Sequence, residues 1–139
     1  MEEKLVIYWD TSAILSALFK DVHSQEAWNW SRREGLHLLS SLAAAETYAV
    51  INRIHRERNL SEILVKAALE AFEQGPWHSI NMNPDNDQIK RLGSKWPLRG
   101  ADLWHLAMTC TLTAALPEIR LLTFDQRLGI AARGEKIKA

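Results

Sequence analysis

The sequence predicts an α/β fold in which a parallel β-sheet is flanked by helices. Short apolar runs rich in strand-forming residues alternate with helical patterns along the whole chain. Such alternation is typical of strands joined by crossover helices, which makes neighbouring strands parallel. The 139 residues fit one domain spanning residues 1–139, and we find no internal repeat, low-complexity tract or linker. We therefore expect an α/β sandwich with a single sheet at its centre.

Four short runs are the predicted strands, at residues 5–9, 37–40, 77–82 and 119–124. The first is buried by composition and ends at Asp10. The third follows the Gly75-Pro76 pair, which ends the helix before it. Ile137 could belong to a further short strand at the edge of the sheet.

The predicted helices lie between these strands. Residues 11–19 form the first, with Asp10 or Thr11 as its N-cap, and residues 24–33 form the second, with Ser24 as its cap and Gly35 as its stop. The remaining helices are expected at residues 42–58, about 60–74, 84–96, 101–115 and 126–132. Asn59 with Glu62 resembles a capping arrangement, and Asn83-Pro84 resembles an N-cap followed by proline at the first helical position.

No strand separates the two helical patterns between residues 42 and 74. We expect this pair to project from the sheet as a hairpin, where it could serve as a substrate clamp or as a partner surface.

The composition is that of an ordinary globular domain, with 47% hydrophobic and 24% charged residues. Cys110 is the only cysteine, which excludes an intramolecular disulfide and a cysteine-rich zinc site. The formal net charge is zero, which argues against a large non-specific nucleic-acid surface but not against a local basic patch. No targeting segment and no run as long as a membrane span is visible, so we expect a cytoplasmic protein without a membrane partner.

Four acids occupy the same kind of position along the chain. Asp10 and Asp125 follow predicted strands, whereas Asp102 and Glu46 lie in the first turns of predicted helices. Open parallel sheets bind ligands at the carboxyl ends of their strands, so we expect these four acids to meet at one edge. Each taken alone has an ordinary explanation as a helix cap, a turn residue or an acid at the positive end of a helix.

Converging carboxylates repel one another, and a hard divalent cation relieves that repulsion. Mg²⁺ prefers oxygen ligands and binds directly to one or two carboxylates, with water completing its shell. The lack of clustered histidines or cysteines points to Mg²⁺ or Mn²⁺ rather than zinc. Such a site can hydrolyse phosphodiesters by holding the scissile phosphate and activating water.

The surroundings of the four acids resemble the motifs of the PIN-domain family, in the same order along nearly the whole chain. The similar segments are Asp10-Thr11-Ser12 after an apolar run, Ser41 to Thr47 around Glu46, Ala101 to Ala107 around Asp102, and Leu121 to Leu128 around Asp125. Trp9 departs from the family pattern, because it is bulkier than the small aliphatic residue expected before the first acid.

The resemblance implies a three-layer α/β/α sandwich and a Mg²⁺- or Mn²⁺-dependent endoribonuclease. It assigns Asp10, Glu46, Asp102 and Asp125 to the catalytic metal site, with Asp10 and Asp102 as the best candidates for direct ligands. Ser12 and Thr123 could orient water at the metal, with a capping or turn role as the alternative. The compact layout is most similar to toxins of the VapBC toxin–antitoxin type, which implies an RNA substrate, a cognate antitoxin and a homodimer.

Several other residues carry open alternatives. Arg99 could meet a substrate phosphate, as could the basic cluster of Arg53, His55, Arg56 and Arg58, although a solvated helix end explains that cluster equally well. His105 could act as a general base, but a packed histidine is the simpler explanation. One of the six tryptophans could be exposed at a dimer or antitoxin interface.

Other functions also remain open from the sequence. An RNA-processing or DNA-acting nuclease would use the same acids outside a toxin–antitoxin system. A non-catalytic binding module would keep only the fold, and the presence of all four acids argues against it. An aspartyl phosphatase would need a second acid where Ser12 stands.

Overall fold

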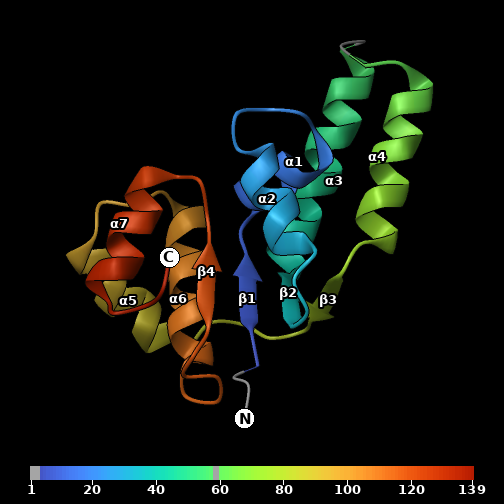
Figure 1. The fold of residues 1–139 in the computed structure, drawn as a ribbon. Helices are drawn as coiled ribbons and strands as arrows, with labels where there is room; N and C mark the ends of the chain where they lie inside the picture. Colours follow the sequence, from blue (N-terminus) through green and yellow to red (C-terminus); the bar gives the residue numbers. More distant parts are fainter. Residues whose placement is uncertain (1–3, 58–59) are drawn as a thin grey trace.

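In a computed structural model, which describes residues 4–57 and 60–139, the chain folds into a four-stranded parallel sheet covered by helices. The order of strands across the sheet is β3-β2-β1-β4. The strands are β1 (Val6–Trp9), β2 (Leu36–Ser40), β3 (Trp77–Ile80) and β4 (Arg120–Leu122). The helices are α1 (Thr11–Leu18), α2 (Ser24–Ser31), α3 (Ser41–Arg56), α4 (Glu62–Gln74), α5 (Asn86–Lys95), α6 (Gly100–Leu112) and α7 (Gln126–Gly134). The three-layer α/β/α sandwich predicted from the sequence is therefore confirmed (Figure 1).

The central strand β1 divides the interior into two cores, because its side chains alternate between the faces of the sheet. Val6 and Tyr8 pack with residues of α5, α6 and α7 on one face. Ile7 and Trp9 pack with residues of α1 to α4 on the other. All four side chains are buried, as expected for a strand covered by helices on both sides.

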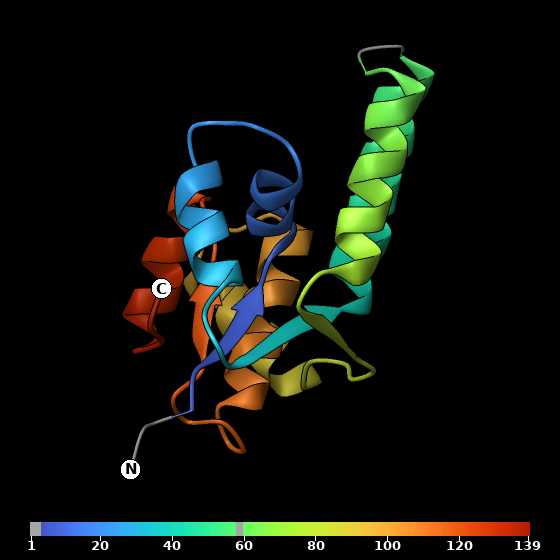
Figure 2. The ribbon, with the colours of Figure 1, turned by 45° about the vertical axis from the view of Figure 1, so that its right-hand side comes forward.

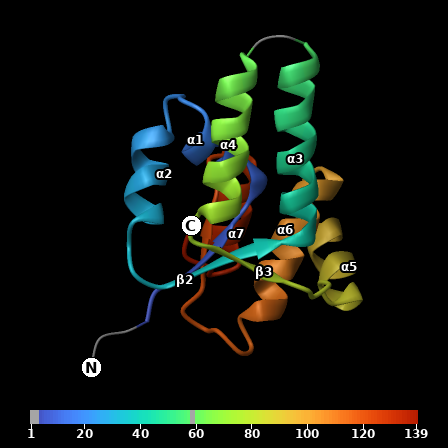
Figure 3. The same cartoon turned by 90° about the vertical axis from the view of Figure 1, so that its right-hand side faces the viewer.

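Helices α3 and α4 leave the sheet together and project from the body of the protein, as Figures 2 and 3 show. The predicted hairpin is thus present. The start of α3 lies against the carboxyl end of β2, whereas its last turn, with Arg53, His55 and Arg56, lies toward the tip. These three residues are exposed, which agrees with a solvated helix end, and Arg58 lies outside the described residues.

Several predicted helix starts are wrong by one or two residues. Ser24 is the first residue of α2 rather than its cap, and its hydroxyl donates to the carbonyls of Ser16 and Phe19. Asn59 lies outside the described residues, and the Ser61 hydroxyl caps α4 by accepting from Leu64 N.

Helix α5 begins at Asn86, with Asp85 as its N-cap, instead of at Pro84. The backbone N–H of Asp85 donates to Thr111 Oγ1 of α6, and this tertiary bond holds the preceding segment outside the helix.

Three further expectations differ in detail. Strand β4 ends at Leu122, so Asp125 lies three residues beyond it, at the N-cap of α7. The edge pairing beyond β4 is a single parallel bridge between Arg120 and Lys138 rather than a strand around Ile137. All six tryptophans are buried or partly buried, so none is exposed as a candidate interface residue.

No helix in the described ranges is both long and apolar enough to cross a membrane.

Candidate active site

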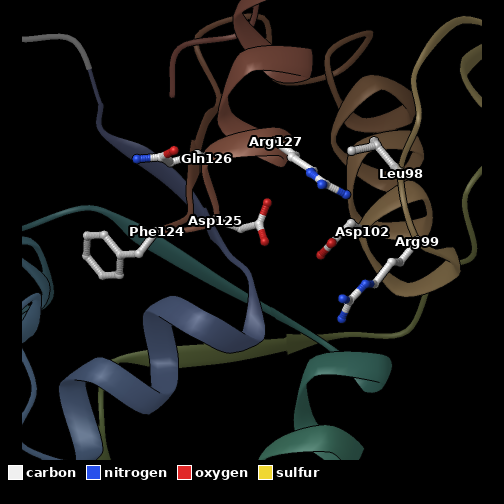
Figure 4. Close-up of a pocket in the computed structure, with 7 residues that line it drawn as sticks. All are labelled: Leu98, Arg99, Asp102, Phe124, Asp125, Gln126 and Arg127. Carbon is white, nitrogen blue, oxygen red and sulfur yellow. The ribbon is translucent and has the colours of Figure 1, made fainter.

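A cleft of about 430 Å³ opens at the carboxyl edge of the sheet, between the start of α6 and the β4–α7 loop. Its lining residues are Leu98, Arg99, Asp102, Phe124, Asp125, Gln126 and Arg127. Figure 4 shows the carboxylates of Asp102 and Asp125 pointing toward the same space. This is the edge at which parallel sheets bind their ligands.

Asp10 does not line this cleft and is almost completely buried, with 2% of its surface exposed. It ends β1 and caps α1, and its Oδ1 accepts bonds from Ala13 N at 2.8 Å and Ser12 Oγ at 2.7 Å. Its Oδ2 accepts from Thr123 Oγ1 at 2.5 Å. Burial raises the pKa of Asp10 to about 6 although these three bonds oppose the shift, and the charge of Asp102 raises it further.

Ser12 and Thr123 also tie the two loops of the site together. Ser12 Oγ accepts from Phe124 N at 3.2 Å, and Thr123 Oγ1 accepts from Asp125 N at 3.1 Å. Each hydroxyl therefore donates to Asp10 while it accepts from the loop that carries Asp125. The two residues fix the position of one acid relative to the other.

Asp102 links the acids electrostatically. It lies in the first turn of α6, and its pKa is raised by burial and then by the charges of Asp125 and Glu46, while Arg99 opposes the shift. Asp102 in turn raises the pKa of Asp10. Asp102 is thus within electrostatic range of the other three sequence-predicted acids, although only Asp102 and Asp125 line the cleft.

Glu46 reaches this region from α3. Its Oε1 accepts from Thr11 Oγ1 at 2.7 Å and lies 3.5 Å from His105 Nε2. His105 is buried, and its Nδ1 lies 2.6 Å from the Tyr8 hydroxyl. Burial lowers the pKa of His105, even though the charge of Glu46 and its contact with the ring oppose the shift. The packed-histidine explanation accounts for its burial, and its contact with Glu46 is a relationship that the sequence did not suggest.

Residues 7–134 match the PIN domain in a comparison with protein-family sequence models. The chain belongs to the PIN-domain family. Among solved structures, the fold is similar to that of the Mycobacterium tuberculosis toxin VapC20, described as cleaving the sarcin–ricin loop, with a TM-score of 0.60. The two chains are 15% identical over 90% of this chain and 94% of VapC20. A comparison with curated protein sequences finds no match.

Membership of the PIN family supports a nuclease, and therefore a hydrolase, as the general activity of this chain. The structural likeness to VapC20 supports the fold. The cleft with its acids is the feature of this PIN domain on which such an activity would depend.

The donor set of this PIN domain fits a hydrated Mg²⁺ or Mn²⁺ ion. Within residues 4–57 and 60–139, no three acids, histidines or cysteines form a ready-made cage for a metal. Mg²⁺ does not need one, since it binds one or two carboxylates directly and keeps several waters. Asp102 accepts no hydrogen bond from any described side chain or backbone group, and Asp125 uses only Oδ1, in the cap of α7. Oxygen atoms of both residues are therefore available in the cleft.

Two arginines flank these carboxylates. Arg99, which the sequence suggested as a substrate contact, and Arg127 lie to either side of Asp102 in the view of Figure 4. Arg127 was missed, although its position two residues after Asp125 on the same loop and helix start could have suggested it. Arg91 and Lys95, which precede Arg99 in the chain, instead pair with Glu135, each at 2.7 Å.

Proposed function

We propose that this chain is a Mg²⁺- or Mn²⁺-dependent endoribonuclease and the toxin of a VapBC-type pair. The observation that carries the proposal is the coupling of Asp10, Glu46 and Asp125 to Asp102 beside a cleft that two arginines flank. Two carboxylates in one cleft, with a buried carboxylate close enough to feel their charge, are costly unless a cation or a proton balances them. Both the PIN family and the order of its motifs support nuclease chemistry at this position.

In this proposal Asp102 and Asp10 hold the ion, and Asp125 and Glu46 act through water or on a second ion. The ion would lower the pKa of the attacking water and balance the charge on the scissile phosphate. Ser12 and Thr123 keep Asp10 ionised and oriented by donating to it. Arg99 and Arg127 would grip the phosphates of the substrate on either side of the cut.

RNA is the proposed substrate because the motif resemblance points to ribonucleases and because the fold is similar to that of VapC20, described as cleaving the sarcin–ricin loop. The projecting α3–α4 hairpin supports a protein partner. It exposes Ile63 and Leu64, two apolar side chains that a bound antitoxin or a second copy of the chain could cover.

The decisive experiment incubates the purified protein with RNA in Mn²⁺ or Mg²⁺, in chelator, and with the Asp10→Asn variant. Cleavage by the wild type with metal, and none in the other two arms, is the expected result. Equal cleavage in all arms would reveal a contaminating nuclease and remove the proposal. Parallel incubation with DNA distinguishes a DNA-acting PIN nuclease, and growth arrest on expression of the wild type but not of Asp10→Asn tests the toxin role.

A further inference from the structure

A second hollow, of about 450 Å³, adjoins the acidic cleft on the side of α7. It is formed by the loop between α5 and α6 together with the first turns of α7. Its lining residues are Trp96, Pro97, Leu98, Arg127 and Ile130. Leu98 and Arg127 line both the hollow and the cleft, so the two spaces are continuous along one wall. The cleft is acidic and polar, whereas this extension is mainly apolar.

The aromatic ring in this wall is held in place from several sides. Trp96 Nε1 donates to Glu135 Oε2 at 2.9 Å, and Lys95 Nζ lies 5.5 Å from the centre of the ring. The ring also lies directly against Gly134, where a Cβ atom would collide with it. A preorganised ring loses little conformational freedom when a flat ligand stacks on it.

The charges around the hollow favour an anionic ligand. Arg127 forms no ion pair within the described part of the chain, and its guanidinium group points toward the cleft beside Asp102 (Figure 4). Its side chain therefore lines an apolar space while its charge faces the place where a phosphate would lie. An aromatic and apolar wall next to a cation is the combination that single-stranded nucleic acids use, with bases stacked and phosphates paired.

The dimensions agree with a nucleotide. The volume falls within the range of about 300–1,000 Å³ found for small-ligand pockets. Ile130 lies five residues after Asp125, the N-cap of α7, which corresponds to about 7.5 Å along a helix. That length is about twice the rise of roughly 3.4 Å between stacked nucleotides of one strand.

We propose that this hollow binds a nucleobase of single-stranded RNA, one or two nucleotides from the phosphate that is cleaved, and thereby selects where the enzyme cuts. The inference rests on the proposed nuclease function and adds a base-selecting subsite to it. Trp96, Leu98 and Ile130 contact the base, and Arg127 contacts the phosphate that joins it to the cleavage point.

The test maps the cleavage positions of full-length protein on a randomised single-stranded RNA with Mn²⁺. Wild type is expected to prefer certain bases one or two nucleotides from the cut. Trp96→Leu and Ile130→Asp should flatten that preference and lower kcat/KM by about tenfold, as loss of a stacking contact does. Trp96→Phe keeps an aromatic ring and should retain most of the preference. Met82→Asp places the same charge at a similarly exposed apolar residue on another part of the surface. It should change neither the base preference nor kcat/KM.

Three outcomes separate this inference from the proposed function. If wild type cuts RNA and both subsite variants keep its base preference, the subsite is wrong while the nuclease stands. If wild type does not cut, the nuclease proposal fails, and RNA binding in chelator decides: weaker binding by Trp96→Leu and Ile130→Asp supports the subsite, and equal binding overturns it. If Ile130→Asp instead converts a dimer to a monomer without changing base preference, the hollow is a subunit interface and the inference is wrong.

Discussion

Thr123 donates a hydrogen bond of 2.5 Å to Asp10 across a separation of 113 positions in the chain. The bond joins the loop after β4 to the end of β1, the two neighbouring strands at the centre of the site. It is one of three bonds that lower the pKa of Asp10 against the effect of burial. The ionisation of the most buried acid therefore depends on a hydroxyl from a distant part of the sequence.

Replacing Thr123 with valine is expected to raise the pKa of Asp10 above about 6, because the carboxylate loses its Oδ2 donor. NMR titration of the Asp carboxyl carbons in metal-free protein measures this shift. Hydrogen bonds to charged groups contribute about 1.5–3 kcal/mol, so kcat/KM for RNA cleavage should fall roughly tenfold to hundredfold.

Thr113→Val is the matched control, since the Thr113 hydroxyl donates only to the carbonyl of Cys110 at the end of α6. It should leave both the titration and the activity unchanged. An Asp10 titration that does not move in Thr123→Val would show that the bond has no influence on the acid.

Asp10→Asn is expected to stabilise the metal-free protein at neutral pH. The pKa of Asp10 is about 6 when folded, against about 3.9 for an unperturbed aspartate. At a pH between these two pKa values, the folded state holds a proton that the unfolded state has released. The stability of the fold therefore decreases as the pH rises through this range. Removing the charge should raise the free energy of unfolding by about 1–3 kcal/mol at pH 7.5 in chelator. Near pH 4 it should leave the free energy of unfolding unchanged.

Urea unfolding of both proteins at the two pH values measures the difference. A variant that is less stable than the wild type at pH 7.5 would mean that the bonds from Ser12 and Thr123 to the charged carboxylate outweigh its burial, contrary to this expectation.

Mn²⁺ should raise the melting temperature of the wild type, because a ligand that binds only the folded state stabilises it. At a concentration about 100-fold above Kd the gain is about 2.7 kcal/mol, or roughly 10 °C for a domain of this size. Asp102→Asn should lose most of this response. Asp87→Asn is the control, since Asp87 lies in the first turn of α5 as Asp102 lies in the first turn of α6, but outside the cleft. An equal response from the two variants would remove Asp102 from the proposed ligands.

Much of this site could be predicted from the sequence, because its acids lie at strand ends and helix starts, where the topology of the backbone determines their positions. Asp10 ends a buried strand, and Asp102 and Asp125 stand at helix starts, so a parallel sheet brings them to one edge whatever the details of packing. The resemblance to PIN motifs then identified which acids to consider.

The features of the site that the sequence did not indicate depend on long side chains and on tertiary contacts. The bond from Thr11 to Glu46 joins two helices whose relative placement no local pattern encodes. The pairing of Arg91 and Lys95 with Glu135 similarly depends on how α5 meets the end of α7, which leaves Arg99 and Arg127 as the cations of the cleft. Caps were misplaced for the same reason, since a tertiary bond such as that from Asp85 to Thr111 competes with local capping.

Glu135→Gln is expected to destabilise the protein at neutral pH and to have no effect in strong acid. Burial raises the pKa of Glu135, but bonds from Lys95, Arg91 and Trp96 outweigh burial and lower it to about 2. A carboxyl with a depressed pKa stabilises the fold above its unfolded pKa of about 4.3, and this contribution is lost as the pH falls toward 2. Because Arg91 and Lys95 are about half exposed, with side-chain exposures of 48% and 51%, solvent weakens the pairs and we expect a loss of about 1–2 kcal/mol.

Urea unfolding of wild type and variant between pH 2 and pH 7 tests this, because the other acids titrate equally in both proteins and cancel in the difference. Glu118→Gln is the control, since Glu118 pairs with Lys138 at 2.7 Å but both side chains are about half exposed, at 52% and 53%. It should change stability by less than about 1 kcal/mol. A difference for Glu135→Gln that stays constant down to pH 2 would mean that the glutamate acts through packing against Trp96 rather than through its charge.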